Sequence, residues 1–137
     1  MVATAIGFGL LAMLGWGLWA VFAKLATNTL PPALAMVISY ATGTVIAFGY
    51  VLSQRGSFSV PTEGALLATV AGIFAGVAGV AFYSGLDLGR ASVVTTVSAL
   101  YFAVPVVVGI LFLGEIIDAA DVAGIGFAIV AVVLLAR

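Results

Sequence analysis

The sequence predicts an all-α integral membrane protein, built as a bundle of five transmembrane helices. Hydrophobic residues make up 65% of the 137-residue chain. Charged residues make up 7%, whereas soluble domains contain about 25%. The charges occur in clusters, and the uncharged stretches between them are long enough to cross a bilayer. Such a chain folds in lipid, and it lacks the basic surface that binding to nucleic acid requires.

The predicted spans follow the uncharged stretches. They are continuous apolar runs rich in Ala and Leu, which excludes the alternating strands of a membrane barrel. Pro32 suits the first turn of the second helix, and Asp118 is placed to cap the fifth. Because no linker interrupts the chain, residues 1–137 are predicted to form one transmembrane domain. Its five helices are expected over residues 3–26, 32–52, 64–86, 92–113 and 119–135.

The sequence lacks the residues and motifs that are typical of thiol chemistry, metal binding, nucleophilic catalysis and nucleotide binding. The chain contains no cysteine and no histidine, so it has neither thiols nor the commonest metal ligand. No nucleophile lies beside a base, and no nucleotide-binding loop is present. We therefore expect a protein that is not an enzyme and that uses no metal and no cofactor.

The charged residues all lie at or near predicted helix ends. No span has an Asp, Glu, His, Lys or Arg at its centre, which argues against tight proton coupling through an intramembrane carboxylate. Lys24, Arg90 and Arg137 fall on one side of the membrane, and Arg55 falls on the other. The positive-inside rule then favours an outside N-terminus, but only weakly.

Small residues follow one face of the third predicted helix. Gly72, Gly76, Gly79 and Tyr83 are spaced by four, three and four residues. Such a stripe lets another helix approach closely. Alternatively, it leaves room for a substrate beside Tyr83.

Polar groups and a proline share one face of the fourth predicted helix, at Thr95, Ser98, Tyr101 and Pro105. Because proline has no N–H, the Tyr101 carbonyl is expected to lose its helical partner. In one interpretation Pro105 only kinks the helix and the hydroxyls bond back to their own backbone. In the other, the carbonyl and the hydroxyls line a cavity.

The first two predicted helices carry aromatic and hydroxyl side chains as well. Trp16 and Trp19 share a face, and Trp16 lies too deep for the headgroup belt, so its indole should face the bundle. Lys24 is expected to reach the membrane interface, with contact to a substrate as the alternative. The second helix pairs Tyr40 with Thr44 and Ser39 with Thr42. The residues expected to line a substrate cavity are Trp16, Trp19, Tyr40, Tyr83, Ser98 and Tyr101.

A family resemblance rests on several short motifs in a characteristic order. They are residues 15–17, 22–24, 82–86, 89–94, 98–101, Pro105, 111–115 and 134–137, with Gly124 in the last helix. In these motifs the chain resembles the EamA-like part of the drug/metabolite transporter superfamily. The resemblance implies ten helices in two inverted halves, of which this chain is similar to one half. The related small multidrug resistance transporters are antiparallel dimers, but their proton-binding glutamate has no counterpart here.

These observations predict a transporter that moves a small molecule across the membrane by alternating access. A lone five-helix chain rebuilds the ten-helix pattern by pairing with an inverted copy, so an antiparallel homodimer is expected. The lipid bilayer surrounds it, and a prokaryotic plasma membrane is the expected location. The alternatives are a non-transporting membrane partner, one subunit of a heterodimeric transporter, or part of a lipid flippase.

Overall fold

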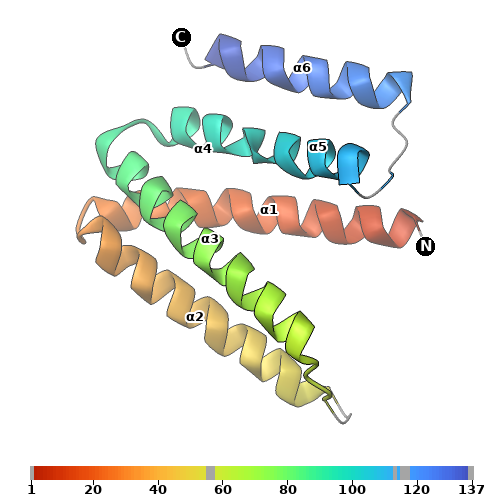
Figure 1. The fold of residues 1–137 in the computed structure, drawn as a ribbon. Helices are drawn as coiled ribbons and strands as arrows, with labels where there is room; N and C mark the ends of the chain where they lie inside the picture. The colour runs from red at the N-terminus through yellow and green to blue at the C-terminus, as the bar shows by residue number, and fades with distance from the viewer. Residues whose placement is uncertain (1, 55–57, 113, 115–117, 136–137) are drawn as a thin grey trace. The chain divides into compact units, whose positions relative to one another are not determined.

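In the computed structural model, helices joined by short loops make up the residues that it describes, and these contain no strand (Figure 1). The described residues are 2–54, 58–112, 114 and 118–135, with only the backbone of residues 2, 121 and 135. The charges of Arg55 and Arg137 and the predicted helix end at residue 113 lie outside them. The predicted all-α membrane fold is confirmed.

Three long apolar helices form the N-terminal part of the chain. They are α1 (Val2–Thr27), α2 (Pro32–Ser53) and α3 (Thr62–Leu88). Each begins and ends within two residues of its predicted bounds, and each is long and apolar enough to cross a membrane. Pro32 occupies the first position of α2, where an N–H would have no helical partner.

The fourth predicted helix is interrupted. It consists of α4 (Ala91–Ala99), a 3-10 turn η1 (Leu100–Phe102) and α5 (Ala103–Phe112), followed by the shorter α6 (Ala119–Leu135). Together, Ala91–Phe112 is a fourth stretch of membrane-spanning length. The turn lies just before Pro105, which therefore falls in the first turn of α5, where its missing N–H costs little.

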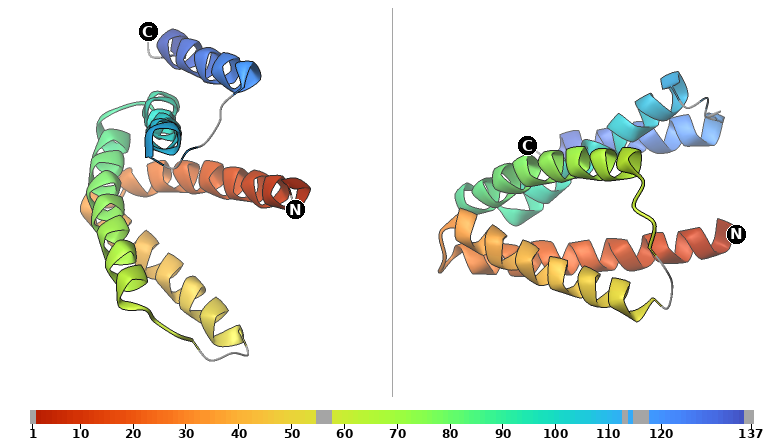
Figure 2. Two further views of the ribbon diagram at one scale, coloured as in Figure 1. Left: turned by 45° about the vertical axis from the view of Figure 1, so that its right-hand side comes forward. Right: turned by 60° about the horizontal axis from the view of Figure 1, so that its bottom comes forward.

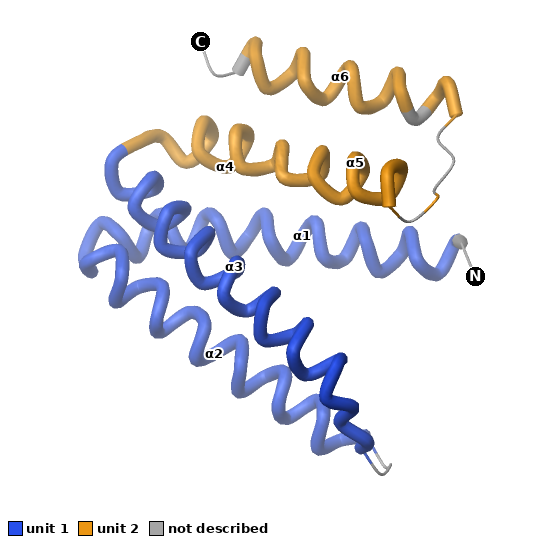
Figure 3. Tube along the Cα trace, in the orientation of Figure 1, with its two compact units in different colours: residues 1–88 blue, residues 89–137 orange. Residues whose placement is uncertain are grey.

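The chain divides into two compact units, residues 1–88 and residues 89–137 (Figure 3). In the first unit, α1, α2 and α3 pack against one another in all three pairings, and Figure 2 shows these helices from two further directions. In the second unit, α6 packs against α4 and η1.

Small residues make up most of the interior of the first unit. The buried positions include Ala20, Ala23, Ala35 and Gly79. Small side chains at crossings allow helix backbones to approach closely, which is how helices adhere in lipid. Most of the large apolar side chains are exposed, with Phe8 at 70% and Val45 at 72%. An apolar exterior over long helices requires lipid around it, so the chain is a multi-pass integral membrane protein.

Candidate functional site

The indole of Trp19 joins the three helices of the first unit. Its Nε1–H donates to Oγ of Ser39 on α2 at 2.8 Å. Its ring stacks on Phe82 of α3, with centroids 5.1 Å apart and planes 17° from parallel. Tyr83 meets the same indole edge-on at 5.7 Å. The hydrogen bond and the two ring contacts together restrict the rotation of the Trp19 side chain.

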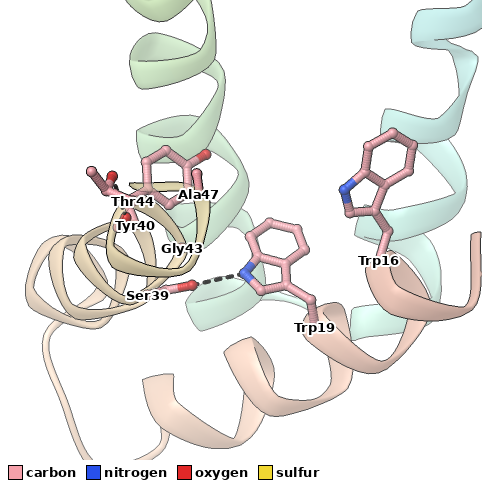
Figure 4. Close-up of a pocket in the computed structure, with 7 residues that line it drawn as sticks. All are labelled: Trp16, Trp19, Ser39, Tyr40, Gly43, Thr44 and Ala47. Atoms are coloured by element: carbon pink, nitrogen blue, oxygen red, sulfur yellow. Dashed lines mark hydrogen bonds between the residues drawn. The ribbon is translucent and has the colours of Figure 1, made fainter. Parts of the chain in front are cut away.

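An open pocket of about 540 Å³ lies between α1 and α2 (Figure 4). This volume is in the range of small-molecule sites, which is about 300–1,000 Å³. Trp16 and Trp19 line it from α1, one helical turn apart. The α2 wall repeats every four residues and is formed by Ser39, Tyr40, Gly43, Thr44 and Ala47. None of these lining residues carries a charge.

Two hydroxyls of the α2 wall donate hydrogen bonds to backbone carbonyls. The Thr44 hydroxyl donates to the Tyr40 carbonyl at 2.8 Å, within its own helix. The Tyr40 phenol donates to the Ala75 carbonyl of α3 at 3.4 Å. The oxygen atoms of both hydroxyls therefore keep lone pairs that can accept a hydrogen bond from a solute.

The position of the Tyr40 ring depends on Gly79 of α3. A Cβ built at Gly79 would overlap the Tyr40 hydroxyl and would lie 2.8 Å from the Met36 Cε. A larger residue at Gly79 would force the Tyr40 ring or the Met36 side chain to shift. By contrast, a Cβ at Gly72 or Gly76 would meet nothing within 4 Å. Close helix packing is thus seen at Gly79 of the predicted glycine stripe. For Gly72 and Gly76, close packing against another helix stays a prediction.

The structure brings three of the six predicted cavity residues to one pocket. Trp16, Trp19 and Tyr40 line it, and Tyr83 lies behind Trp19, only 1% exposed. Ser98 and Tyr101 belong to the second unit.

Polar groups on the predicted strip of the fourth span bond locally. The Ser98 hydroxyl donates to the Thr95 carbonyl at 3.0 Å, and the Thr95 hydroxyl donates to the Ala91 carbonyl at 2.7 Å. The Ala103 N–H points to the carbonyls of Leu100 and Tyr101. The Tyr101 carbonyl, which the sequence predicts to be free, is engaged within the 3-10 turn, whereas the Tyr101 side chain is 61% exposed.

Sequence reasoning missed the role of Ser39. It pairs Ser39 with Thr42, but the Thr42 hydroxyl donates to the Ile38 carbonyl of its own helix, and Ser39 meets Trp19 instead. Gly43 and Ala47 were missed as well, although both lie on the face that carries the predicted pair Tyr40 and Thr44. The four-residue spacing of that pair was the available signal.

Lys24 contacts the end of α3. Its side chain is half-buried, and Nζ donates to the Leu86 carbonyl near the end of α3. The last carbonyls of a helix have no intrahelical partner and carry the negative end of its dipole. A lysine is therefore well placed at this helix end, and its position at the membrane interface stays a prediction.

The predicted cap of the last helix has matching geometry. Oδ1 of Asp118 accepts a hydrogen bond from the Ala120 N–H at 2.8 Å. This satisfies one of the unpaired N–H groups in the first turn of α6.

Among the described residues, no group of three or more acidic side chains could hold a metal ion.

Comparison with known families gives one match that runs across both units. The sequence model of the EamA-like transporter family matches residues 3–137. Searches of curated proteins and of solved structures found no match.

Proposed function

Because the chain belongs to the EamA-like transporter family, we propose that it moves a small metabolite or drug-like solute across the membrane by alternating access, using the pocket between α1 and α2. Membership of this family identifies the chain as a membrane transporter of the drug/metabolite transporter type. The observation that carries the proposed site is the Trp19 indole, held by Ser39 and Phe82 at the wall of that pocket.

The proposed roles follow from the geometry. Trp16, Trp19 and Tyr40 enclose the solute with their rings, and the Tyr40 hydroxyl orients it. Tyr83 supports Trp19 from behind. For Ser98 and Tyr101, which belong to the second unit, contact with the solute stays a prediction. The match of the family model over both units supports one transmembrane domain over residues 1–137.

Transport is proposed to proceed without a proton-binding carboxylate inside the membrane. The acidic residues of the first unit are Glu63, in the first turn of α3, and Asp87, next to its end. Neither position is at the centre of a span, where a proton and a solute would compete for one group. We propose a facilitator or an exporter, with no enzymatic step.

Two copies in opposite orientations are proposed to form the working transporter, in a prokaryotic plasma membrane. Inverted repeats carry solutes at the interface of their two halves, which rock around a fixed site. The helices of residues 1–137 correspond to one such half. The alternative, a subunit of a heterodimer, predicts that a second, similar small membrane protein co-purifies with this chain.

Reconstituted protein provides the test. A thermal-shift screen of the purified protein against a metabolite panel first identifies a ligand, because a ligand that binds only the folded state raises the melting temperature. Uptake of that ligand into proteoliposomes is then compared between the wild type and Trp19→Phe, Tyr40→Phe and Tyr101→Phe. Tyr50→Phe is the matched control, since Tyr50 is also on α2 but outside the pocket.

We expect the three substitutions to lower uptake several-fold without reducing the folded yield, and the control to have no effect. Unchanged uptake after conservative replacement of all six proposed residues would overturn the site. These are Trp16, Trp19, Tyr40, Tyr83, Ser98 and Tyr101.

A further inference from the structure

The chemistry of the pocket walls restricts the class of solute that they can hold. Resting on the proposed function, we infer that the pocket between α1 and α2 takes an uncharged solute with one flat ring and one small polar group, such as a hydroxyl or a primary amide. Three properties of the lining residues lead to this inference: their charge, their shape and their unused hydrogen-bonding groups.

Charge is the first property. All the lining residues are uncharged, so a charged solute would leave water without gaining an ionic partner. The nearest cation along α1 is Lys24, five residues beyond Trp19 and therefore about 7.5 Å further along the helix axis. Its ammonium is engaged by the Leu86 carbonyl. Aromatic faces attract cations, but no carboxylate among the lining residues completes a cation site.

Shape is the second property. Trp16 and Trp19 present two large flat side chains from one face of α1 (Figure 4). Opposite them, Gly43 has no side chain and Ala47 has a small one, so the α2 wall is recessed between its polar residues. A Cβ at Gly43 would meet nothing within 4 Å. Flat surfaces facing a recess favour a planar ring, since stacked rings gain contact area with little loss of freedom.

Unused hydrogen-bonding groups are the third property. Ser39 accepts the Trp19 N–H, and its own hydroxyl proton has no acceptor among the described residues. The Trp16 N–H likewise has no acceptor in the described part of the chain, and Trp16 is 62% exposed. The Tyr40 oxygen keeps its lone pairs, because its proton goes to the Ala75 carbonyl. The pocket can thus both donate and accept, which suits a hydroxyl or an amide.

Tryptophan fluorescence gives a direct test, because the chain has two tryptophans and both line this pocket. The full-length protein in lipid nanodiscs is titrated with benzamide, benzylammonium, benzoate and toluene. These probes share one ring and differ in charge and polar group. We expect saturable binding of benzamide, with an affinity at least ten-fold higher than that of the other three.

Two variants locate the binding. Tyr40→Phe and Ser39→Ala should each weaken benzamide binding several-fold, and Tyr50→Phe should leave it unchanged. Equal or tighter binding of benzylammonium or benzoate overturns the uncharged class, and equal binding of toluene indicates a lipid-like groove and overturns the polar group. Benzamide binding that neither variant weakens also overturns the inference. The proposed function is judged separately, by the effect of the pocket substitutions on uptake.

Discussion

The indole N–H of Trp19 on α1 donates to the hydroxyl of Ser39 on α2 at 2.8 Å, and the same ring stacks on Phe82 of α3. One side chain thereby connects all three helices of the first unit. Hydrogen bonds between membrane helices contribute modestly to stability, about 0.6 kcal/mol on average. Their larger consequence here is geometric, because the bond sets the direction in which the indole faces the pocket.

Replacing Ser39 tests this connection. Ser39→Ala removes the acceptor of the Trp19 N–H, so we expect a loss of about 0.5–1.5 kcal/mol in the free energy of unfolding and a shift of the tryptophan emission. Unfolding in mixed micelles of increasing SDS content measures the first quantity. Ser53→Ala is the control, because the Ser53 hydroxyl donates to the Tyr50 carbonyl within its own helix. Equal effects of the two substitutions would contradict the role of Ser39.

Alanine substitutions along the glycine stripe should differ strongly. Gly79→Ala places a methyl group against the Tyr40 hydroxyl and the Met36 side chain, and overpacking of this kind costs about 1–3 kcal/mol. Gly72→Ala enters open space and should be neutral or slightly stabilising, because alanine favours helix more than glycine does. Thermal unfolding of the two variants checks the contrast. A harmless Gly79→Ala would show that Tyr40 is not held at this crossing.

The lysine on α1 should stabilise the end of α3. Lys24→Met removes a charged donor from the Leu86 carbonyl, so we expect a loss of about 1–3 kcal/mol in the free energy of unfolding. Lys24→Arg keeps a charged donor and should recover part of this loss. Both are measured by unfolding in mixed micelles. Should Lys24→Met unfold like the wild type, the contact would contribute nothing.

The proline of the fourth span should be nearly neutral for stability. Pro105 lies in the first turn of α5, where its N–H is not needed, so Pro105→Ala should change the free energy of unfolding by less than about 1 kcal/mol. In the middle of a continuous helix, proline would cost about 3 kcal/mol. A gain in stability close to that value would show that α4 and α5 belong to one unbroken helix.

The absence of cysteine makes the proposed inverted pairing easy to test. Thr29→Cys lies between α1 and α2, and Phe58→Cys lies beyond the other end of α2. In intact cells, a membrane-impermeant thiol reagent should label about half of each variant if the chain inserts in both orientations. Full labelling of one variant and none of the other would exclude the antiparallel homodimer.

The positions of the long apolar helices follow from the amino-acid sequence alone. Partition into lipid sums over the residues of one segment and needs no tertiary contact, so an uncharged run of sufficient length is enough. This is why α1, α2 and α3 end within two residues of their predicted bounds. Local rules also identified Pro32 at the start of α2 and Asp118 before α6. Aromatic side chains that share a helix face within a span identified Trp16, Trp19 and Tyr40 as candidates for the pocket.

Which faces of the helices meet is visible only in the packed bundle. In a soluble protein the apolar face of a helix points to the core, but here apolar side chains surround most of each helix because lipid lies outside the bundle. Periodicity therefore could not show that Ser39 pairs with Trp19, that Gly79 is the glycine in close contact, or that Lys24 reaches the Leu86 carbonyl. These partners depend on how small residues let the helices approach, which is a property of the packed bundle.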